Sequence, residues 1–198
     1  MISLRKGVML VGVVGVMMTQ IFAGTIDSAK LLDAARIVKG RNKSIGDGQL
    51  FTRDCSGTVN AIFAEAGYPL ASRLNKAYQT GMNGTAILHA IAESVEVSDI
   101  QPGDLVFFND TYDRNGNGLS DDVLTHVGIV MQYDRSSGSI HFIHYNTWMD
   151  EIVEQQLNVI RPADKSENII LRWPSKNDPQ QKRYAGELIH SFGRIHTY

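Results

Sequence analysis

The sequence predicts an α+β fold in which N-terminal helices pack on an antiparallel sheet. Helix-type patterns fill the first half of the chain, whereas short apolar runs of strand length dominate from Asp104 onward. Helices followed by strands, without regular alternation, favour an antiparallel sheet over a doubly wound parallel sheet. A length of 198 residues suits one domain with a sizeable core. We therefore expect one domain over residues 24–198, with its core at about residues 45–150.

The elements of this domain follow from hydrophobic periodicity and from capping residues. Asp27 or Ser28 can cap the first helix, and Gly67 follows the end of the second. Three helices are expected at about residues 27–40, 54–66 and 85–94, and four strands at 105–108, 127–133, 140–145 and 169–173.

The first 23 residues have the layout of a secretory signal peptide. Arg5 and Lys6 precede an apolar run from Gly7 to Met18, and the small residue Ala23 marks a cleavage site. An uncleaved membrane anchor is the alternative, but the run is shorter than the roughly 18 residues that a spanning helix needs. We therefore expect an exported protein with no stable membrane span after signal cleavage. The net charge of -2 provides no basic stripe, so nucleic acid is not an expected partner.

The chain has one cysteine, Cys55, in the first turn of the second predicted helix. It lies four residues before Val59, on the apolar stripe that Val59 forms with Ile62, Phe63 and Ala66. Free N–H groups and the helix dipole at this position favour a thiolate and predict a lowered pKa. Cys55 is therefore a candidate nucleophile, with a small buried hydrophobic residue as the alternative.

Two histidines are predicted to meet on a β-hairpin formed by residues 126–133 and 139–146. The turn is centred near residues 136 and 137, so position 126 falls opposite 146 or 147 and His144 becomes a near-diagonal neighbour of His126. A thiol nucleophile needs a base, and the base usually needs a third group to orient its ring. His126 is the candidate base and His144 the candidate orienting residue.

Strand alternation ranks the other residues of this hairpin. His141 points to the face opposite His144 and is the weaker candidate, whereas Asn146 shares the face of His144 and is the reserve orienting residue. Gly128, on the face of His126, would leave room for a helix end or a substrate.

Three stretches resemble the NlpC-type family of cell-wall cysteine peptidases. They are Asp54-Cys55-Ser56-Gly57 at a helix start, residues 101–108 (QPGDLVFF) at a strand start, and residues 125–130 (THVGIV); His144 matches the family's third, ring-orienting residue. The resemblance covers about residues 45–150. It implies a papain-like fold and hydrolysis of peptide bonds in peptidoglycan stem peptides, often beside D-glutamate or diaminopimelate. It also implies a periplasmic or secreted, cell-wall-associated protein.

The implied catalytic residues are Cys55 as nucleophile, His126 as base and His144 as orienting residue, with no cofactor required for the chemistry. Asp54 and Ser56 flank the nucleophile and are implied to contact substrate, although N-cap and first-turn roles explain them equally well. Other amidase or acyl-transfer reactions on the same pair remain open. Thr58 stands where the family often has a large apolar residue.

An insertion from Asn109 to Leu124 also departs from the family. It places oxygen-bearing side chains at positions 1, 3, 5 and 9 and glycine at position 6 of a calcium-type loop, although Leu124 replaces the usual position-12 Glu. The predicted ligands are Asp113, Asn115, Asn117 and Asp121, with Asp121 or Asp122 completing the shell. The alternatives are a turn-rich surface loop without metal or, for the whole chain, a non-catalytic calcium-dependent wall-binding module.

Overall fold

The computed structural model describes residues 24–173 and 181–197, and it has the predicted α+β architecture of helices packed on an antiparallel sheet. The predicted signal peptide, residues 1–23, lies outside the described residues. Within the described ranges, no helix combines the length and the apolar character needed to cross a membrane.

The helices lie mainly in the first half of the chain. The described residues form α1 (Ser28–Arg41), α2 (Cys55–Glu65), α3 (Ala71–Ala77), α4 (Gly84–Ile91) and the short 3-10 helices η1 (Val97–Asp99) and η2 (Ala185–Leu188). Asp27 caps α1 by accepting hydrogen bonds from the N–H groups of Ala29 and Lys30. The first two predicted helices are confirmed. The third ends at Ile91, before the predicted end at Ser94, and α3 was not predicted.

Two antiparallel sheets are described. The strands are β1 (Ile45–Gly46), β2 (Gln49–Leu50), β3 (Glu93–Val95), β4 (Leu105–Phe108), β5 (His126–Asp134), β6 (Ser139–Asn146), β7 (Glu151–Asn158) and β8 (Ile189–Arg194). β1 and β2 form a small hairpin, and the other six strands form a sheet in the order β3-β8-β4-β5-β6-β7. β8, from the end of the described chain, is therefore an internal strand.

The predicted hairpin is present as β5 and β6. Ile129 pairs with Ile143 and Val130 with Phe142, and the register shifts by one residue beyond Val130. Continuing the first part of this register toward the open end of the hairpin places position 126 opposite 146. His144 is therefore a diagonal neighbour of His126, as the sequence predicted.

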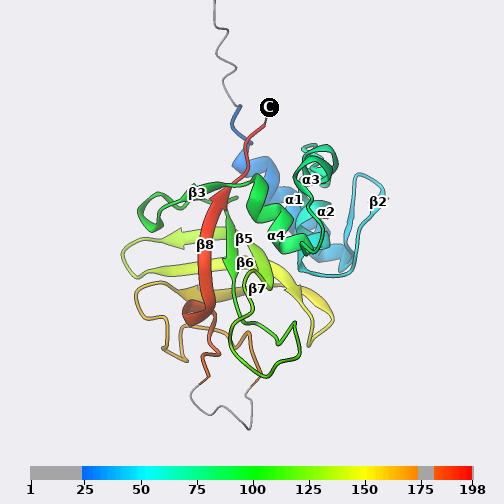
Figure 1. Cartoon of the computed structure of the whole chain (residues 1–198). Coiled ribbons are helices and arrows are strands. Elements are labelled where there is room, and N and C mark those ends of the chain that lie inside the picture. The colour runs from blue at the N-terminus through cyan, green and yellow to red at the C-terminus, as the bar shows by residue number, and fades with distance from the viewer. Residues whose placement is uncertain (1–23, 174–180, 198) are drawn as a thin grey trace, which may run out of the picture.

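Apolar residues cover both faces of the six-stranded sheet. Figure 1 shows the four α-helices gathered on one side of the sheet, and one core cluster joins residues of α1, α2 and α4 to Phe107, Val127 and Ile129. A second cluster contains Val130 and Phe142 together with Leu171 and η2. The helices hold α2 against the sheet, so its N-terminus stays in place near the ends of β5 and β6.

One predicted strand is wrong, and five observed strands were missed. Residues 169–173 make only an isolated bridge, between Ile170 and Tyr184, and Leu171 from this segment covers the second core. The strands that were not predicted are β1, β2, β3, β7 and β8.

Candidate active site

Cys55, His126 and His144 line a single pocket of about 400 Å³. The pocket lies where the N-termini of α2 and α4 meet the ends of β5 and β6. Asp54, Ser56 and Asn146 also line it, and other parts of its wall come from the insertion and from the segment after β6: Thr111, Tyr112, Thr147, Trp148, Ile170 and Leu171. The structure thus brings together the three candidate catalytic residues of the sequence analysis, Cys55, His126 and His144.

Cys55 is the first residue of α2, and Asp54 is its N-cap. The Asp54 carboxylate accepts hydrogen bonds from the Gly57 N–H at 2.7 Å and from the Ser56 hydroxyl at 2.8 Å. The N-cap role that the sequence left open for Asp54 is therefore present. No described residue accepts a hydrogen bond from the Cys55 N–H, one of the N–H groups that a helix start leaves without an intrahelical partner.

The segment before α2 is fixed to the far end of β6. Arg53 donates from Nε to the Tyr145 hydroxyl at 3.1 Å and from Nη2 to the Asp150 carbonyl at 2.8 Å. These bonds hold the start of α2 beside the strand that carries His144.

The start of α4 contributes a residue that the sequence analysis missed. The Thr85 hydroxyl lies 3.7 Å from Cys55 Sγ, and Thr85 is buried. Gly84 allows this approach because a Cβ atom there would lie 2.2 Å from Ser56 Oγ. A threonine two residues after Asn83, the N-cap of α4, carries no sequence signal of a contact 30 residues away.

The two histidines form a buried hydrogen-bonded chain that continues to β7. His126 Nε2 lies 2.8 Å from His144 Nδ1, and His144 Nε2 lies 2.8 Å from Gln155 Oε1. His126 is 8% exposed and His144 is 1% exposed. Within the described part of the chain, no hydrogen bond joins Cys55 to His126, although both face the same pocket.

Burial shifts the pKa values of all three residues toward their uncharged forms. It raises the pKa of the Cys55 thiol, while hydrogen bonds from Thr85 and from the backbone of Val127 and Ser56 act in the opposite direction. The sequence-based prediction of a lowered Cys55 pKa is therefore wrong for the ligand-free protein. Burial, with the neighbouring His144, lowers the pKa of His126 well below its usual value, and burial lowers the pKa of His144 to about 4.

The remaining hairpin residues also have defined places. His141 pairs with Gln156 across the strands and does not line the pocket, as alternation predicted. At Gly128, a Cβ atom would lie 2.7 Å from the Phe142 ring and 2.9 Å from the Ile143 carbonyl oxygen. The glycine therefore makes room for the neighbouring strand, and the prediction that it admits a helix end or substrate is wrong.

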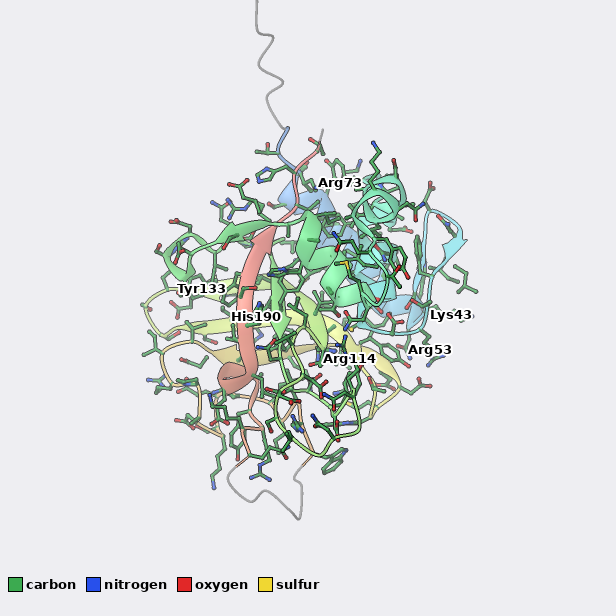
Figure 2. The ribbon with its side chains drawn as sticks, viewed as in Figure 1. Lys43, Arg53, Arg73, Arg114, Tyr133 and His190 are labelled. Carbon is green, nitrogen blue, oxygen red and sulfur yellow. The ribbon has the colours of Figure 1, made fainter. Side chains whose placement is uncertain are left out.

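The insertion before His126 folds into a compact loop. The Asp113 carboxylate accepts from the N–H groups of Gly116 and Gly118, and the Asn117 amide donates to Asp121 at 3.0 Å. Arg114, labelled in Figure 2, lies in this loop and donates from its backbone N–H to the buried Asp122 carboxylate.

The oxygen-bearing side chains of the loop are of the kind that calcium prefers. Asn115 also belongs to the loop and donates to Asp121 at 3.2 Å, so three of the four predicted ligands are joined by hydrogen bonds. Leu119, at loop position 7, uses its carbonyl to accept from Arg172 at 3.3 Å. In the described ranges, no group of three or more His, Cys, Asp or Glu residues is arranged to hold a metal ion. Calcium binding stays a prediction.

Two tryptophans mark the rim of the pocket. Trp148, which lines the pocket, packs against Trp173 with ring centroids 4.9 Å apart, and the residues remain 42% and 65% exposed. Tyr112 from the insertion is also half exposed. The sequence analysis missed this rim because the aromatic residues come from three separated segments.

Comparison with known proteins identifies a family. A sequence model of the NlpC/P60 family matches residues 40–164. Among solved structures, a protein from Staphylococcus aureus subsp. aureus Mu50, described as similar to lipoprotein, NLP/P60 family, aligns with 18% identity and a TM-score of 0.37. The alignment covers 68% of this chain and 43% of that protein. A comparison with curated proteins gives no match.

Proposed function

The chain belongs to the NlpC/P60 family, and on that premise we propose that it is an exported cysteine peptidase that hydrolyses peptide bonds in peptidoglycan stem peptides. Members of the family are typically cysteine-type hydrolases of the cell wall. The observation that carries the proposal is that a thiol at a helix start shares one pocket with a buried chain of hydrogen-bonded histidines.

The proposed reaction begins with an uncharged thiol and uncharged imidazoles, because burial disfavours the charged form of each. The Cys55 sulfur attacks the scissile carbonyl carbon while His126 takes the thiol proton. The Cys55 N–H donates to the oxyanion of the tetrahedral intermediate. His126 then protonates the leaving amine, and water hydrolyses the thioester with His126 again acting as base.

The walls of the pocket suit a peptide with polar and apolar parts. Asp54 and Ser56 lie on one side and bind a polar group of the substrate in this proposal. The Ser56 hydroxyl already donates to Asp54, so a substrate amine or N–H has a preorganised acceptor there. Trp148 and Tyr112 also line the pocket and provide exposed aromatic surface.

Digestion of purified peptidoglycan tests the proposal. We expect the mature wild-type protein to release stem-peptide fragments that mass spectrometry identifies. Cys55→Ala should release none, and His126→Ala should lose at least about 100-fold in rate. His144→Ala should lose much of the activity. His141→Ala is the matched control because its side chain is outside the pocket, and it should stay near wild type.

The same experiment separates the alternatives. An amidase acting at the sugar–peptide junction would release intact stem peptides, and a transpeptidase would form new peptide bonds when an acceptor amine is added. A non-catalytic wall-binding module would sediment with peptidoglycan without releasing fragments. Equal release by wild type and Cys55→Ala would contradict the proposed nucleophile.

The export part of the proposal has its own test. We place the mature protein in the periplasm or outside the cell, associated with the wall. N-terminal sequencing of protein from cell fractions should find a chain that begins close to Gly24. A full-length N-terminus in the cytosolic fraction alone would contradict export.

A further inference from the structure

The turn after β6 fixes the orientation of the Asn146 amide. The backbone N–H groups of Trp148 and Met149 lie 3.0 and 3.2 Å from Asn146 Oδ1. Backbone N–H groups can only donate, so the atom that faces them must be the amide oxygen. The Asn146 NH₂ group then faces Gln155, with Nδ2 at 3.3 Å from Gln155 Oε1.

This donor in turn fixes the Gln155 amide. An NH₂ group requires an acceptor, so Gln155 presents its oxygen toward Asn146 and, at 2.8 Å, toward His144 Nε2. An amide oxygen cannot donate, and His144 must therefore carry its proton on Nε2. Burial keeps this ring neutral at pH 7, so its Nδ1 has a free lone pair.

The same constraint reaches His126. His144 Nδ1 lies 2.8 Å from His126 Nε2 and, as an acceptor, needs a donor there. His126 is also buried and neutral, so a proton on Nε2 leaves the lone pair on Nδ1. Nδ1 is then the atom that accepts a proton from a nucleophile.

We propose that Gln155 is a positioning residue that sets the tautomers of both histidines and thereby makes Nδ1 of His126 the base. The turn between β6 and β7 fixes the Asn146 amide, and Asn146 fixes the Gln155 amide. Gln155 then determines which nitrogen of His144 carries the proton, and His144 does the same for His126. Gln155 acts through His144 and does not line the pocket. The catalytic consequence rests on the proposed function, whereas the tautomers do not.

Imidazole nitrogen NMR of histidine-labelled protein measures the tautomers directly. We expect His126 and His144 of the wild-type protein to be protonated on Nε2 alone at pH 7. Gln155→Met keeps the side-chain length and removes the acceptor, so His144 should populate both tautomers. Gln155→Glu keeps an acceptor and should retain the single Nε2–H form. Gln156→Met is the matched control, because Gln156 pairs with His141 one residue along β7.

A second variant covers the case in which Gln155→Met fails to fold. Asn146→Asp preserves the acceptor for the turn N–H groups but turns an oxygen toward Gln155. The Gln155 amide should then rotate and present its NH₂ group to His144. If Gln155→Met folds and its His144 keeps the single Nε2–H tautomer, the proposal is overturned. If Gln155→Met does not fold, the same result in Asn146→Asp overturns it.

Kinetics give the second readout. Gln155→Met should lower kcat by about tenfold or more with little change in KM, since a misplaced tautomer affects proton transfer more than binding. Gln155→Glu should restore most of the rate, and Gln156→Met should match wild type. If wild-type protein does not cut peptidoglycan, the proposed function fails, and the NMR result still decides the role of Gln155.

Discussion

At Cys55, two effects act in opposite directions on the thiol pKa. The start of α2 favours the thiolate. However, a helix dipole typically stabilises a charge at a helix terminus by only about 0.3–1 kcal/mol. Burial against apolar neighbours disfavours the thiolate more strongly, and the pKa rises. Position in the helix could be read from the sequence, whereas the depth of burial depends on residues from α4 and β5.

The buried histidines make folding stability depend on pH. The pKa of His144 is about 4 in the folded protein and about 6.5 in an exposed histidine, so the unfolded chain binds more protons between these values. Stability contributed by neutral His144 is complete above pH 6.5 and is lost as the pH falls toward 4. The loss from His144 alone should be about 3 kcal/mol at pH 4, and His126 adds to it.

Urea unfolding at pH 7 and pH 4 measures this loss. In His144→Gln the difference between the two pH values should shrink by about the same 3 kcal/mol. His141→Gln, on the other face of β6, should keep the wild-type difference. An unchanged difference in His144→Gln would show that another group causes the acid sensitivity.

The sequence predicted part of the site and not the rest for a physical reason. His126 and His144 follow from one hairpin, whose turn and alternation fix which side chains meet. Thr85 and Gln155 lie on α4 and β7, and their contacts depend on packing between elements that are distant along the chain. No local pattern encodes that packing.

At the scale of elements, the motif at residues 101–108 has a structural explanation. The buried Asp104 carboxylate accepts from Arg194 Nε at 2.7 Å and Nη2 at 2.8 Å, and from the Gln101 N–H at 2.7 Å. This ion pair ties the start of β4 to the end of β8. The motif therefore maintains the sheet next to the site.

Removing one partner should leave a buried charge uncompensated. We expect Arg194→Met to lower the free energy of unfolding by about 3 kcal/mol, because Asp104 would stay buried without its cation. Arg36→Met is the control, since the Arg36–Asp33 pair is exposed and should contribute less than about 1 kcal/mol. Denaturant unfolding compares the two. Equal effects would mean that the Asp104 pair has no special role.

The insertion connects directly to the strand of the base. Thr125 accepts from the Thr111 N–H at 2.9 Å, and the Asp122 N–H donates to Asp110 at 2.7 Å. These hydrogen bonds connect the fold of the insertion to the start of β5, where His126 lies, so a well-ordered insertion should help to hold His126 in place.

Calcium should stabilise this loop and the fold together. A ligand that binds only the folded protein raises Tm as its concentration rises, and a shell without the position-12 Glu should act near about 10⁻⁴ to 10⁻³ M calcium. The measurement is Tm and hydrolysis rate with calcium or chelator, for wild type and Asp113→Ala. If neither the Tm nor the hydrolysis rate of the wild-type protein responds to calcium in that range, the insertion is a turn-rich loop that binds no calcium.

Prediction of the elements succeeded where the hydrophobic pattern is strong and local. α1, α2, β4 and the β5–β6 hairpin have such patterns. β7 contains Glu154, Gln155 and Gln156 among few apolar residues, so its strand character depends on pairing with β6. Residues 169–173 are mostly apolar, yet they form an irregular segment in which Leu171 and Ile169 contact the second core. A short apolar run therefore indicates contact with a core more reliably than it indicates a β-strand.

At the scale of the whole molecule, the sheet is completed by a strand from the end of the chain. β8 lies between β3 and β4, beyond the residues 40–164 that match the family. Figure 1 shows β8 running across the molecule to the end where the chain begins, and Thr197 forms a bridge with Gly24. The fold thus depends on contacts between residues far apart in the sequence.

Removing the last strand should therefore prevent folding. A chain that ends at Tyr184 lacks η2 and β8, including the buried Leu188 and Phe192. It also leaves an edge of β4 unpaired and Asp104 without Arg194. Because a typical domain is stable by only about 5–15 kcal/mol, the combined loss should exceed its stability.

Far-UV circular dichroism and size-exclusion chromatography test this truncation. We expect the chain ending at Tyr184 to be unfolded or aggregated. A chain ending at Ile195 is the control, because it keeps β8 and loses only the terminal contacts, such as the 2.9 Å His196–Glu93 pair. A peptide of residues 181–198 added to the truncated chain during refolding should restore part of the native signal, because it can re-form the β8 pairing. If the chain ending at Tyr184 melts cooperatively near the wild-type Tm, residues 24–184 fold without β8. The strand would then not be required for folding.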